Sequence, residues 1–168
     1  TGYWKLNASY RMTDFYSNYP TIANHFLEVG SLESQHAYDR TRTTMDVDLE
    51  LLPGKAVRPL VGFSYSRYAG PGLTTYHVGQ DEFGLDQDLK EKDTEYRIGV
   101  AFDAGAFSGQ VVQGWRQFRG EETLRLSTGA GAGNNPGTIL GVPVTLTSLT
   151  RTSKTDIDTP VTSAVVTG

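Results

Sequence analysis

Large apolar residues alternate with polar or small residues along much of the chain, with a period of two. In the stretch EYRIGVAFD (95–103), every second residue from Tyr96 to Phe102 is apolar, and the residues between them are charged or small. This period predicts a β-strand with two unlike faces. No segment keeps a helical apolar period for long. The predicted strands are residues 2–12, 41–51, 57–68, 93–103, 106–118 and, with weaker alternation, 158–168.

The connections between these strands alternate in length. LPGKA after the second strand and AG after the fourth are short, whereas residues 13–40, 69–92 and 119–157 predict long polar loops. Strands joined in this way form an antiparallel up-and-down meander. Its tight turns gather at one end and its long loops at the other.

The tight turn AG predicts the register of its hairpin. A two-residue turn at Ala104 and Gly105 sets Ile98 opposite Val111, so the apolar faces of the two strands coincide. The misfit on that face is Gln113. On the polar face, the same register predicts that Asp93 lies opposite Arg116.

The turn LPGKA predicts the register of the other hairpin. A three-residue loop from Pro53 to Lys55 sets Val47 opposite Val61. A two-residue loop would put the apolar residues of the two strands on opposite faces. With the three-residue loop, Glu50 lies opposite Arg58 on the polar face.

Two interpretations of the apolar face remain open. In a soluble β-sandwich or lipocalin-like barrel that binds a ligand or a protein, this face is the core and the charges meet water. In a transmembrane β-barrel, this face meets lipid and the charges line the lumen. Three features favour the membrane barrel: small residues between the charges, aromatic residues flanking the apolar stretches, and the alternation of short and long connections.

The membrane interpretation assigns residues to each face. The residues predicted to face lipid are Trp4, Leu6, Val47, Leu49, Val61, Phe63, Ile98, Val100, Phe102, Val111 and Trp115. The residues predicted to line the lumen are Lys5, Arg11, Arg42, Asp46, Asp48, Glu50, Arg58, Glu95, Arg97 and Arg116. Rings of charge in a lumen set the selectivity of a pore, but paired charges also fill a narrow lumen without conduction.

Composition excludes several classes of function. A net charge of −4 gives no basic footprint, so we expect no nucleic-acid partner. The chain has 0 Cys, which excludes disulfides, thiolate metal sites and a cysteine nucleophile. The chain begins without Met and stops inside an apparent strand, so we interpret residues 1–168 as one segment of a larger barrel.

The residues that bear other chemistry are few. Asp81, Glu82, Asp86 and Asp88 form an acidic stretch that is a weak candidate for a Ca²⁺ loop, but it lacks EF-hand spacing and a solvated charge run is favoured. His25, His36 and His77 are not spaced as metal ligands, and an outer-membrane hydrolase that uses one of them near a rim is a distant third interpretation. We therefore expect no catalytic residue, no metal and no cofactor.

The predicted strands, most clearly over residues 41–118, resemble the β-barrels of the Gram-negative outer membrane. Within that family, VVQGWRQFRGEE and TDIDTPVTSAVVTG are similar to segments of the barrels that sheath multihaem cytochromes in extracellular electron conduits. The resemblance implies a non-enzymatic barrel in the cell outer membrane, in contact with the lipid bilayer, that acts as a porin-like channel or as a sheath for a periplasmic or surface protein. Two departures are Pro59 inside a strand and a strand number below the roughly 8 of the smallest such barrels.

Overall fold

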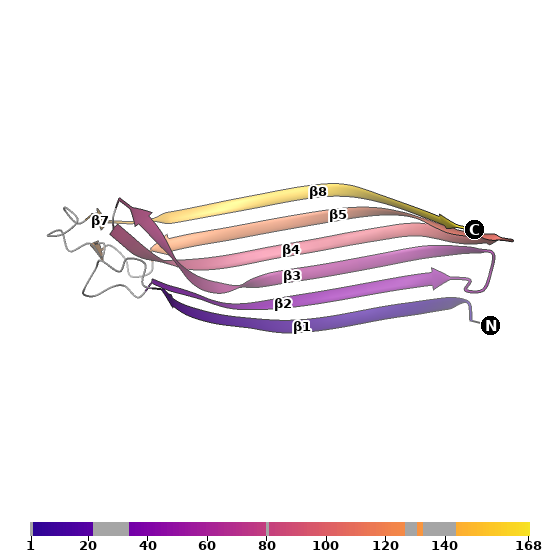
Figure 1. Cartoon of the computed structure of the whole chain (residues 1–168), viewed down its shortest axis with the longest axis horizontal. Helices are drawn as coiled ribbons and strands as arrows, with labels where there is room; N and C mark the ends of the chain where they lie inside the picture. Colours follow the sequence, from indigo (N-terminus) through magenta and orange to yellow (C-terminus); the bar gives the residue numbers. More distant parts are fainter. Residues whose placement is uncertain (1, 22–33, 80, 127–130, 133–143) are drawn as a thin grey trace.

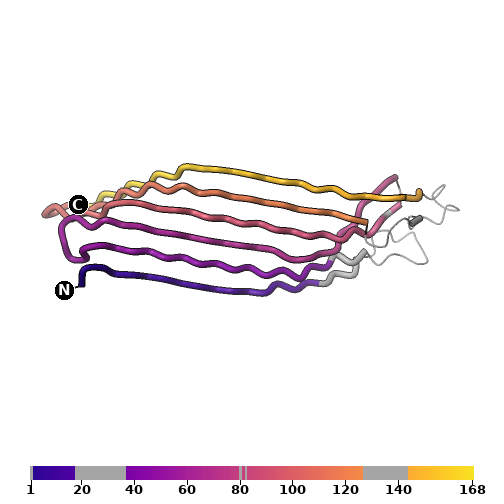
Figure 2. The backbone as a smooth tube through the Cα atoms, turned by 180° about the vertical axis from the view of Figure 1, so that it is seen from behind, coloured from indigo at the N-terminus to yellow at the C-terminus, as the bar shows by residue number. Residues whose placement is uncertain are grey.

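The computed structural model describes residues 2–21, 34–79, 81–126, 131–132 and 144–168. These residues form an all-β structure, and its main element is one antiparallel sheet of six strands in the order β1-β2-β3-β4-β5-β8. Each strand pairs with the next along the chain, so the sheet is an up-and-down meander (Figure 1). Both termini lie at the end of the sheet that carries the tight turns (Figure 2).

The strands of the main sheet are long. They are β1 (Trp4–Thr21), β2 (Ser34–Leu51), β3 (Val57–Val78), β4 (Asp81–Ala104), β5 (Phe107–Leu126) and β8 (Thr150–Thr167). A second, two-stranded sheet joins β6 (Gly131–Ala132) to β7 (Thr145–Leu146) within the connection from β5 to β8. The main sheet is open, with β1 and β8 as its edges. Among the described residues, no helix is long and apolar enough to cross a membrane.

The strands extend beyond the predicted boundaries, and most of the predicted loop residues are strand. β3 and β4 continue to Val78 and from Asp81, so little of the predicted loop 69–92 remains a loop. β1, β2, β5 and β8 likewise take up large parts of 13–40 and 119–157. The prediction missed these extensions because the apolar residues change faces along the strands. On β4, Leu85 and Leu89 alternate with charged residues, but they lie on the face opposite from Tyr96, so this alternation is out of phase with that of residues 93–103.

The register of the first tight hairpin differs from the prediction by two residues. Val47 lies opposite Phe63 rather than Val61. The cause is Leu52, which takes a φ of 53° and donates its N–H to the Tyr3 carbonyl, 2.8 Å away, so it leaves the ladder between β2 and β3. The chain then turns at Pro53 and Gly54, the residues that a type II turn prefers at these positions.

The register of the second tight hairpin is also shifted by two residues. Ala104 stays in the strand opposite Phe107, and the turn is Gly105 and Ala106. Gly105 takes a φ of 65°, and it stands at the first central position, where a type II′ turn needs glycine. Ile98 therefore lies opposite Gln113 rather than Val111. A shift of two residues keeps every side chain on its predicted face.

Pro59 fits the sheet because of its position in the ladder. It lies opposite Val100 of β4, and the last pair between β2 and β3 is Glu50 with Leu60. The missing N–H of Pro59 therefore removes no pair from the ladder between β2 and β3, which has already ended.

Few side chains of the described residues are buried, because the main sheet is a single layer. The buried apolar residues are Phe83, Leu85 and Ala101. Phe83 and Leu85 lie near the end of the hairpin of β3 and β4, where the connection from β5 to β8 approaches. In this region the Val144 N–H donates to Asp81 Oδ2 across 2.8 Å. Phe83 and Leu85 thus form a small core at the end opposite the tight turns, whereas Ala101 lies close to the tight turn that follows β4. Most of the sheet has no second layer.

Candidate functional site

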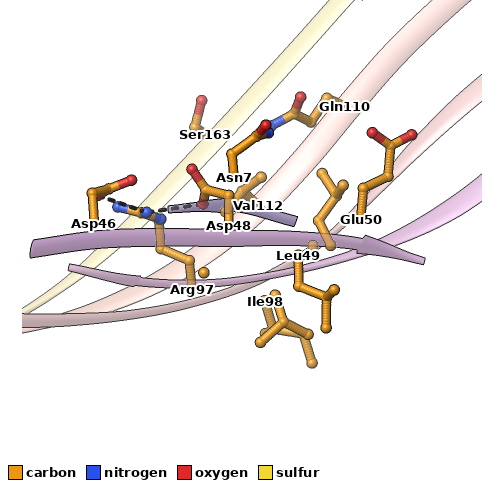
Figure 3. Close-up of a pocket in the computed structure, with 14 residues that line it drawn as sticks. Asn7, Asp46, Asp48, Leu49, Glu50, Arg97, Ile98, Gln110, Val112 and Ser163 are labelled. Atoms are coloured by element: carbon orange, nitrogen blue, oxygen red, sulfur yellow. Dashed lines mark hydrogen bonds and ion pairs between the residues drawn. The ribbon is translucent and has the colours of Figure 1, made fainter. Parts of the chain in front are cut away.

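The register divides the predicted surface residues between the two faces of the sheet. The residues predicted to face lipid share one face, on which Val61 lies directly opposite Ile98. The residues predicted to line a lumen share the other face, on which Gly62 lies opposite both Asp48 and Arg97. Figure 3 shows the same separation, with Ile98 on the opposite side of the ribbons from Asp48.

The charged face is the concave side of the sheet. One cavity on this face is lined by Asn7 of β1, Asp48 of β2, Arg97 of β4, Gln110 of β5 and Ser163 of β8 (Figure 3). In a flat sheet, β1 and β5 would stand about 19 Å apart at ~4.8 Å per strand. Because their side chains line one cavity, the sheet curls toward its charged face. We name this concave side the inner face and the opposite side the outer face.

The outer face carries an apolar band. The band runs from Trp4 to Tyr10 on β1 and from Phe107 to Trp115 on β5. These intervals of six and eight residue steps span about 20–26 Å at ~3.3 Å per residue. The side chains of the band are open to the surroundings, with Ile98 55% and Trp115 51% exposed. A continuous apolar band of this height has no protein partner within the described residues.

Aromatic side chains bound the band at both ends. We name Trp4, Phe102 and Phe107 the turn-end belt, and Tyr10, Tyr65, Tyr96 and Trp115 the loop-end belt. In the loop-end belt, Tyr96 lies opposite Trp115. The ring of Phe63 packs against Tyr96 at a centroid distance of 5.3 Å. Tyr65 lies opposite Thr94 rather than Tyr96, and Phe107 lies opposite Ala104 rather than Phe102. Each belt therefore shifts by two residues between these neighbouring strands and follows a slanted course.

The misfit Gln113 on the outer face is hydrogen-bonded. Its Oε1 accepts from the Thr162 hydroxyl at 2.6 Å, and its Nε2 donates to the Gly114 carbonyl at 2.9 Å. Thr162 lies directly opposite Gln113 on β8. Both polar ends of this amide are thus satisfied, which lowers the cost of placing it in an apolar band.

Arg97 is the centre of a charged network on the inner face, at the level of the apolar band. Its Nη2 lies 3.1 Å from Asp46 Oδ2 and 3.0 Å from Asp48 Oδ1, and its Nη1 lies 3.8 Å from Glu95 Oε1. Nη1 also donates to the Ser64 hydroxyl at 2.5 Å, and that hydroxyl in turn donates to Asp46. Ser64 was not expected to take part in this network.

A glycine makes room for the guanidinium group of Arg97. A Cβ at position 62 would lie 2.6 Å from Arg97 Nε and 2.7 Å from Asp48 Oδ1. Both distances are shorter than any ordinary contact of a methyl group, so an alanine at this position has to displace the charged network. The predicted crowding on the charged face is thus present at Gly62.

Two further ion pairs were expected, and both form diagonally. Arg58 Nε lies 2.9 Å from Glu50 Oε1, and Arg58 also pairs with Asp103. Arg116 Nε donates to Asp93 Oδ2 at 2.9 Å. The predicted partners are correct, but they are not directly opposite, because of the two-residue shift in both hairpins.

Beyond the loop-end belt, the apolar and polar faces exchange sides. On β4 the outer positions become Asp86, Asp88, Lys90 and Lys92, while Leu89 and the buried Leu85 take inner positions. On β5 the inner positions of this part include Phe118, Leu124 and Leu126. The outer face is therefore apolar only between the two belts, and charged beyond the loop-end belt.

A polar cluster on the inner face beyond the belt had no signal in the sequence. Arg40 Nη2 donates to Gln87 Oε1 at 2.5 Å, and Gln87 donates to Glu122. The Arg40 guanidinium also lies 5.3 Å from the centre of the Tyr38 ring. Arg42, predicted to line the lumen, lies 4.9 Å from the Tyr68 ring instead of against a carboxylate. The register of β2 against β3, and of β3 against β4, brings Arg40 and Gln87 together, and no local sequence pattern indicates this contact.

The acidic candidate stretch lies on β4 and not in a loop. Asp81 takes an inner position, whereas Asp86 and Asp88 take outer positions, and Asp88 pairs with Lys90 at 2.7 Å. The part of the chain that the structure describes contains no group of three His, Cys, Asp or Glu side chains that could hold a metal ion. The side chain of Glu82 lies outside the described part.

The histidines give no catalytic arrangement that the structure can test. His25 and the side chain of His36 lie outside the described residues, and His77 lies on β3.

Comparison of the chain with protein-family models, with curated proteins and with solved structures finds no match. Proposals about function therefore depend on the two faces alone.

Proposed function

We propose that the chain forms part of the wall of a non-enzymatic β-barrel in the outer membrane of a Gram-negative bacterium. The apolar band of the outer face meets the lipid, and the inner face lines the lumen. The observation that carries the proposal is the curvature of the sheet: the exposed apolar band is on the convex side, and the paired charges are on the concave side. A soluble barrel or sandwich has the opposite arrangement, with its apolar residues inside.

The dimensions of the band support this proposal. Outer-membrane barrels present an apolar band about 25 Å tall between two aromatic girdles, and their turns are short on the periplasmic side. The band on β1 and β5 spans a similar length, and both tight turns lie beyond its turn-end belt. The turn-end belt then lies at the periplasmic interface and the loop-end belt at the cell surface.

The open edges support a larger barrel. Within the described part of the chain, β1 and β8 each have one edge that pairs with no strand, and an unpaired backbone edge is costly in lipid. The smallest barrels close with about 8 strands. In the proposed barrel, additional strands pair with β1 and β8, and these six strands form one arc of the wall.

The inner charges favour a lumen that is filled or that sheathes a protein partner over an open pore. Arg58 and Arg116 each have a carboxylate partner on the adjacent strand, and Arg97 of β4 reaches across β3 to carboxylates of β2. Pore selectivity requires charges that remain available to the solute. A periplasmic or surface protein, such as a multihaem cytochrome, is the partner that the family resemblance suggests. A porin-like channel is the other form of the same proposal.

Fluorescence quenching tests which face meets lipid. The chain has 2 Trp, and they are Trp4 in the turn-end belt and Trp115 in the loop-end belt. In the complete barrel, with any tryptophan outside residues 1–168 replaced by phenylalanine, the variants W4F and W115F each leave one tryptophan. After refolding into vesicles, we expect both tryptophans to be quenched more by lipids brominated near the headgroup than by lipids brominated near the chain end, because belts lie at the interfaces.

The same samples contain the control and the contrary outcome. A tryptophan placed at Ile98 in a W4F/W115F background should instead be quenched more by the deep label, since Ile98 lies between the belts. Tryptophans that bromolipids do not quench, in a protein that is folded by circular dichroism and dissolves without detergent, would refute the membrane proposal.

A further inference from the structure

Three cations stand side by side on the outer face immediately beyond the loop-end belt. Arg67 of β3 lies opposite Lys92 of β4, and Lys92 lies opposite Arg119 of β5. Arg67 follows Tyr65 by two residues, so it occupies the next outward position on the same face. We name Arg67, Lys92 and Arg119 the basic row.

Cations directly opposite each other on neighbouring strands repel, so this row destabilises the free sheet. Arg119 is compensated by Asp158, 2.8 Å from its Nη2, and by Asp156. Within the described residues, no carboxylate pairs with Arg67 or Lys92. The ammonium group of Lys92 lies over the Tyr65 ring at 5.7 Å.

The nearby cations are already neutralised. Lys90 Nζ lies 2.7 Å from Asp88 Oδ2, and this hydrogen bond raises the pKa of Lys90. Lys154 Nζ lies 3.3 Å from Glu121 Oε2. Lys90 and Lys154 line one surface hollow together with the basic row. Three carboxylates also line the hollow: Glu121 pairs with Lys154, Asp156 lies near Arg119, and Glu91 takes an inner position on β4. Among the described residues, Arg67 and Lys92 are the outer-face cations of this hollow that have no carboxylate partner.

We propose that Arg67 and Lys92, with Arg119 beside them, bind the phosphate group of a membrane lipid. This inference rests on the proposed function, because the outer face must meet lipid. The row then lies just above the apolar band, at the depth of the headgroups. Arginine and lysine form strong charge-assisted hydrogen bonds with phosphate oxygens, and one phosphate placed between the strands relieves the repulsion of the row.

The test compares two double variants of equal charge change. R67Q/K92Q removes the uncompensated cations of the basic row, and K5Q/R11Q removes two cations from the inner face. Each protein, folded in uncharged detergent, is titrated with phosphatidic acid or phosphatidylcholine, and bound lipid is counted by native mass spectrometry. We expect R67Q/K92Q to bind phosphatidic acid about 25-fold more weakly, because each basic residue near an anionic lipid contributes roughly a factor of five. We expect K5Q/R11Q to bind it as the parent chain does.

Several outcomes would overturn the lipid site. Equal losses in both variants would mean that net charge, and not the row, attracts the lipid. Equal binding of phosphatidylcholine would remove the role of an exposed phosphate. Displacement of phosphatidic acid by an equal concentration of inorganic phosphate would point to a site for free phosphate. Because the bromolipid experiment is independent of these variants, its success together with any of these results would leave the barrel proposal standing.

Discussion

Gly62 and Arg97 should behave as one unit when they are mutated. An added Cβ at position 62 would stand 2.6 Å from Arg97 Nε, so Gly62→Ala must displace the guanidinium group from its carboxylate partners. Overpacking of this kind costs about 1–3 kcal/mol. In an Arg97→Ala background the position of Nε is empty, and Asp48, which has lost its guanidinium partner, can turn away from position 62. Gly62→Ala should then be neutral or stabilise the strand by about 0.5–1 kcal/mol, since glycine disfavours strands. The expected coupling energy is therefore about 2 kcal/mol.

The measurement is a double-mutant cycle on the free energy of unfolding. Each variant is folded into lipid vesicles and titrated with denaturant, and the folded fraction is read from the heat-dependent change in the migration of the protein on gels. Gly109→Ala is the matched control, because its Cβ would stand 2.5 Å from Phe102 Cζ on the outer face, away from Arg97. Arg97→Ala should not reduce the cost of Gly109→Ala. If Gly62→Ala and Arg97→Ala were additive within about 0.5 kcal/mol, the Arg97 side chain would not occupy the position described.

Two other substitutions test the faces and the lumen. Ile98→Arg, in the middle of the apolar band, should cost about 2–4 kcal/mol in vesicle folding, whereas Gln117→Arg on the same face beyond the loop-end belt should cost about 0–1 kcal/mol; equal costs would contradict the proposed depth. Arg58→Ala removes the partner of Glu50 and Asp103. In a dry or occupied lumen it should cost about 3–5 kcal/mol and lower the folded yield. A well-folded Arg58→Ala protein with altered ion selectivity in planar bilayers would indicate an open pore instead.

The sequence predicts the faces of the sheet better than its register. Val47 shares a face with Val61, and Ile98 with Val111, in both the prediction and the structure, because the error in each hairpin is an even number of residues. The positive φ of Leu52 caused the first error, and no residue pattern signals that conformation at a leucine. Glycine at 105 did signal a turn, but it is compatible with either of the first two turn positions.

The strand extensions and the inner cluster around Arg40 were beyond prediction for a different reason. Alternation identifies a strand only where one face is apolar and the other is not. From Asp81 to Asp93 the apolar residues lie on the face opposite from those of residues 95–103 and are separated by many charges, so this part of β4 has the composition of a polar loop and does not continue the pattern of the predicted strand. The contacts of Arg40 with Gln87 depend on pairing across two strand boundaries, which a local pattern does not contain.

The slanted belts have a consequence for how the strands find their register. A slip of two residues between β4 and β5 leaves every side chain on its own face, so burial alone does not oppose it. Such a slip would, however, carry Trp115 about 7 Å along the strand, away from its place opposite Tyr96. In the proposed membrane, the same slip would also separate Lys92 of β4 from Arg119 of β5 in depth. One of these two cations would move toward the hydrocarbon and the other away from it. Several registers keep the apolar side chains on the outer face equally well. The thickness of the bilayer then favours the one register in which the aromatic rings of each belt lie at a common depth in the membrane.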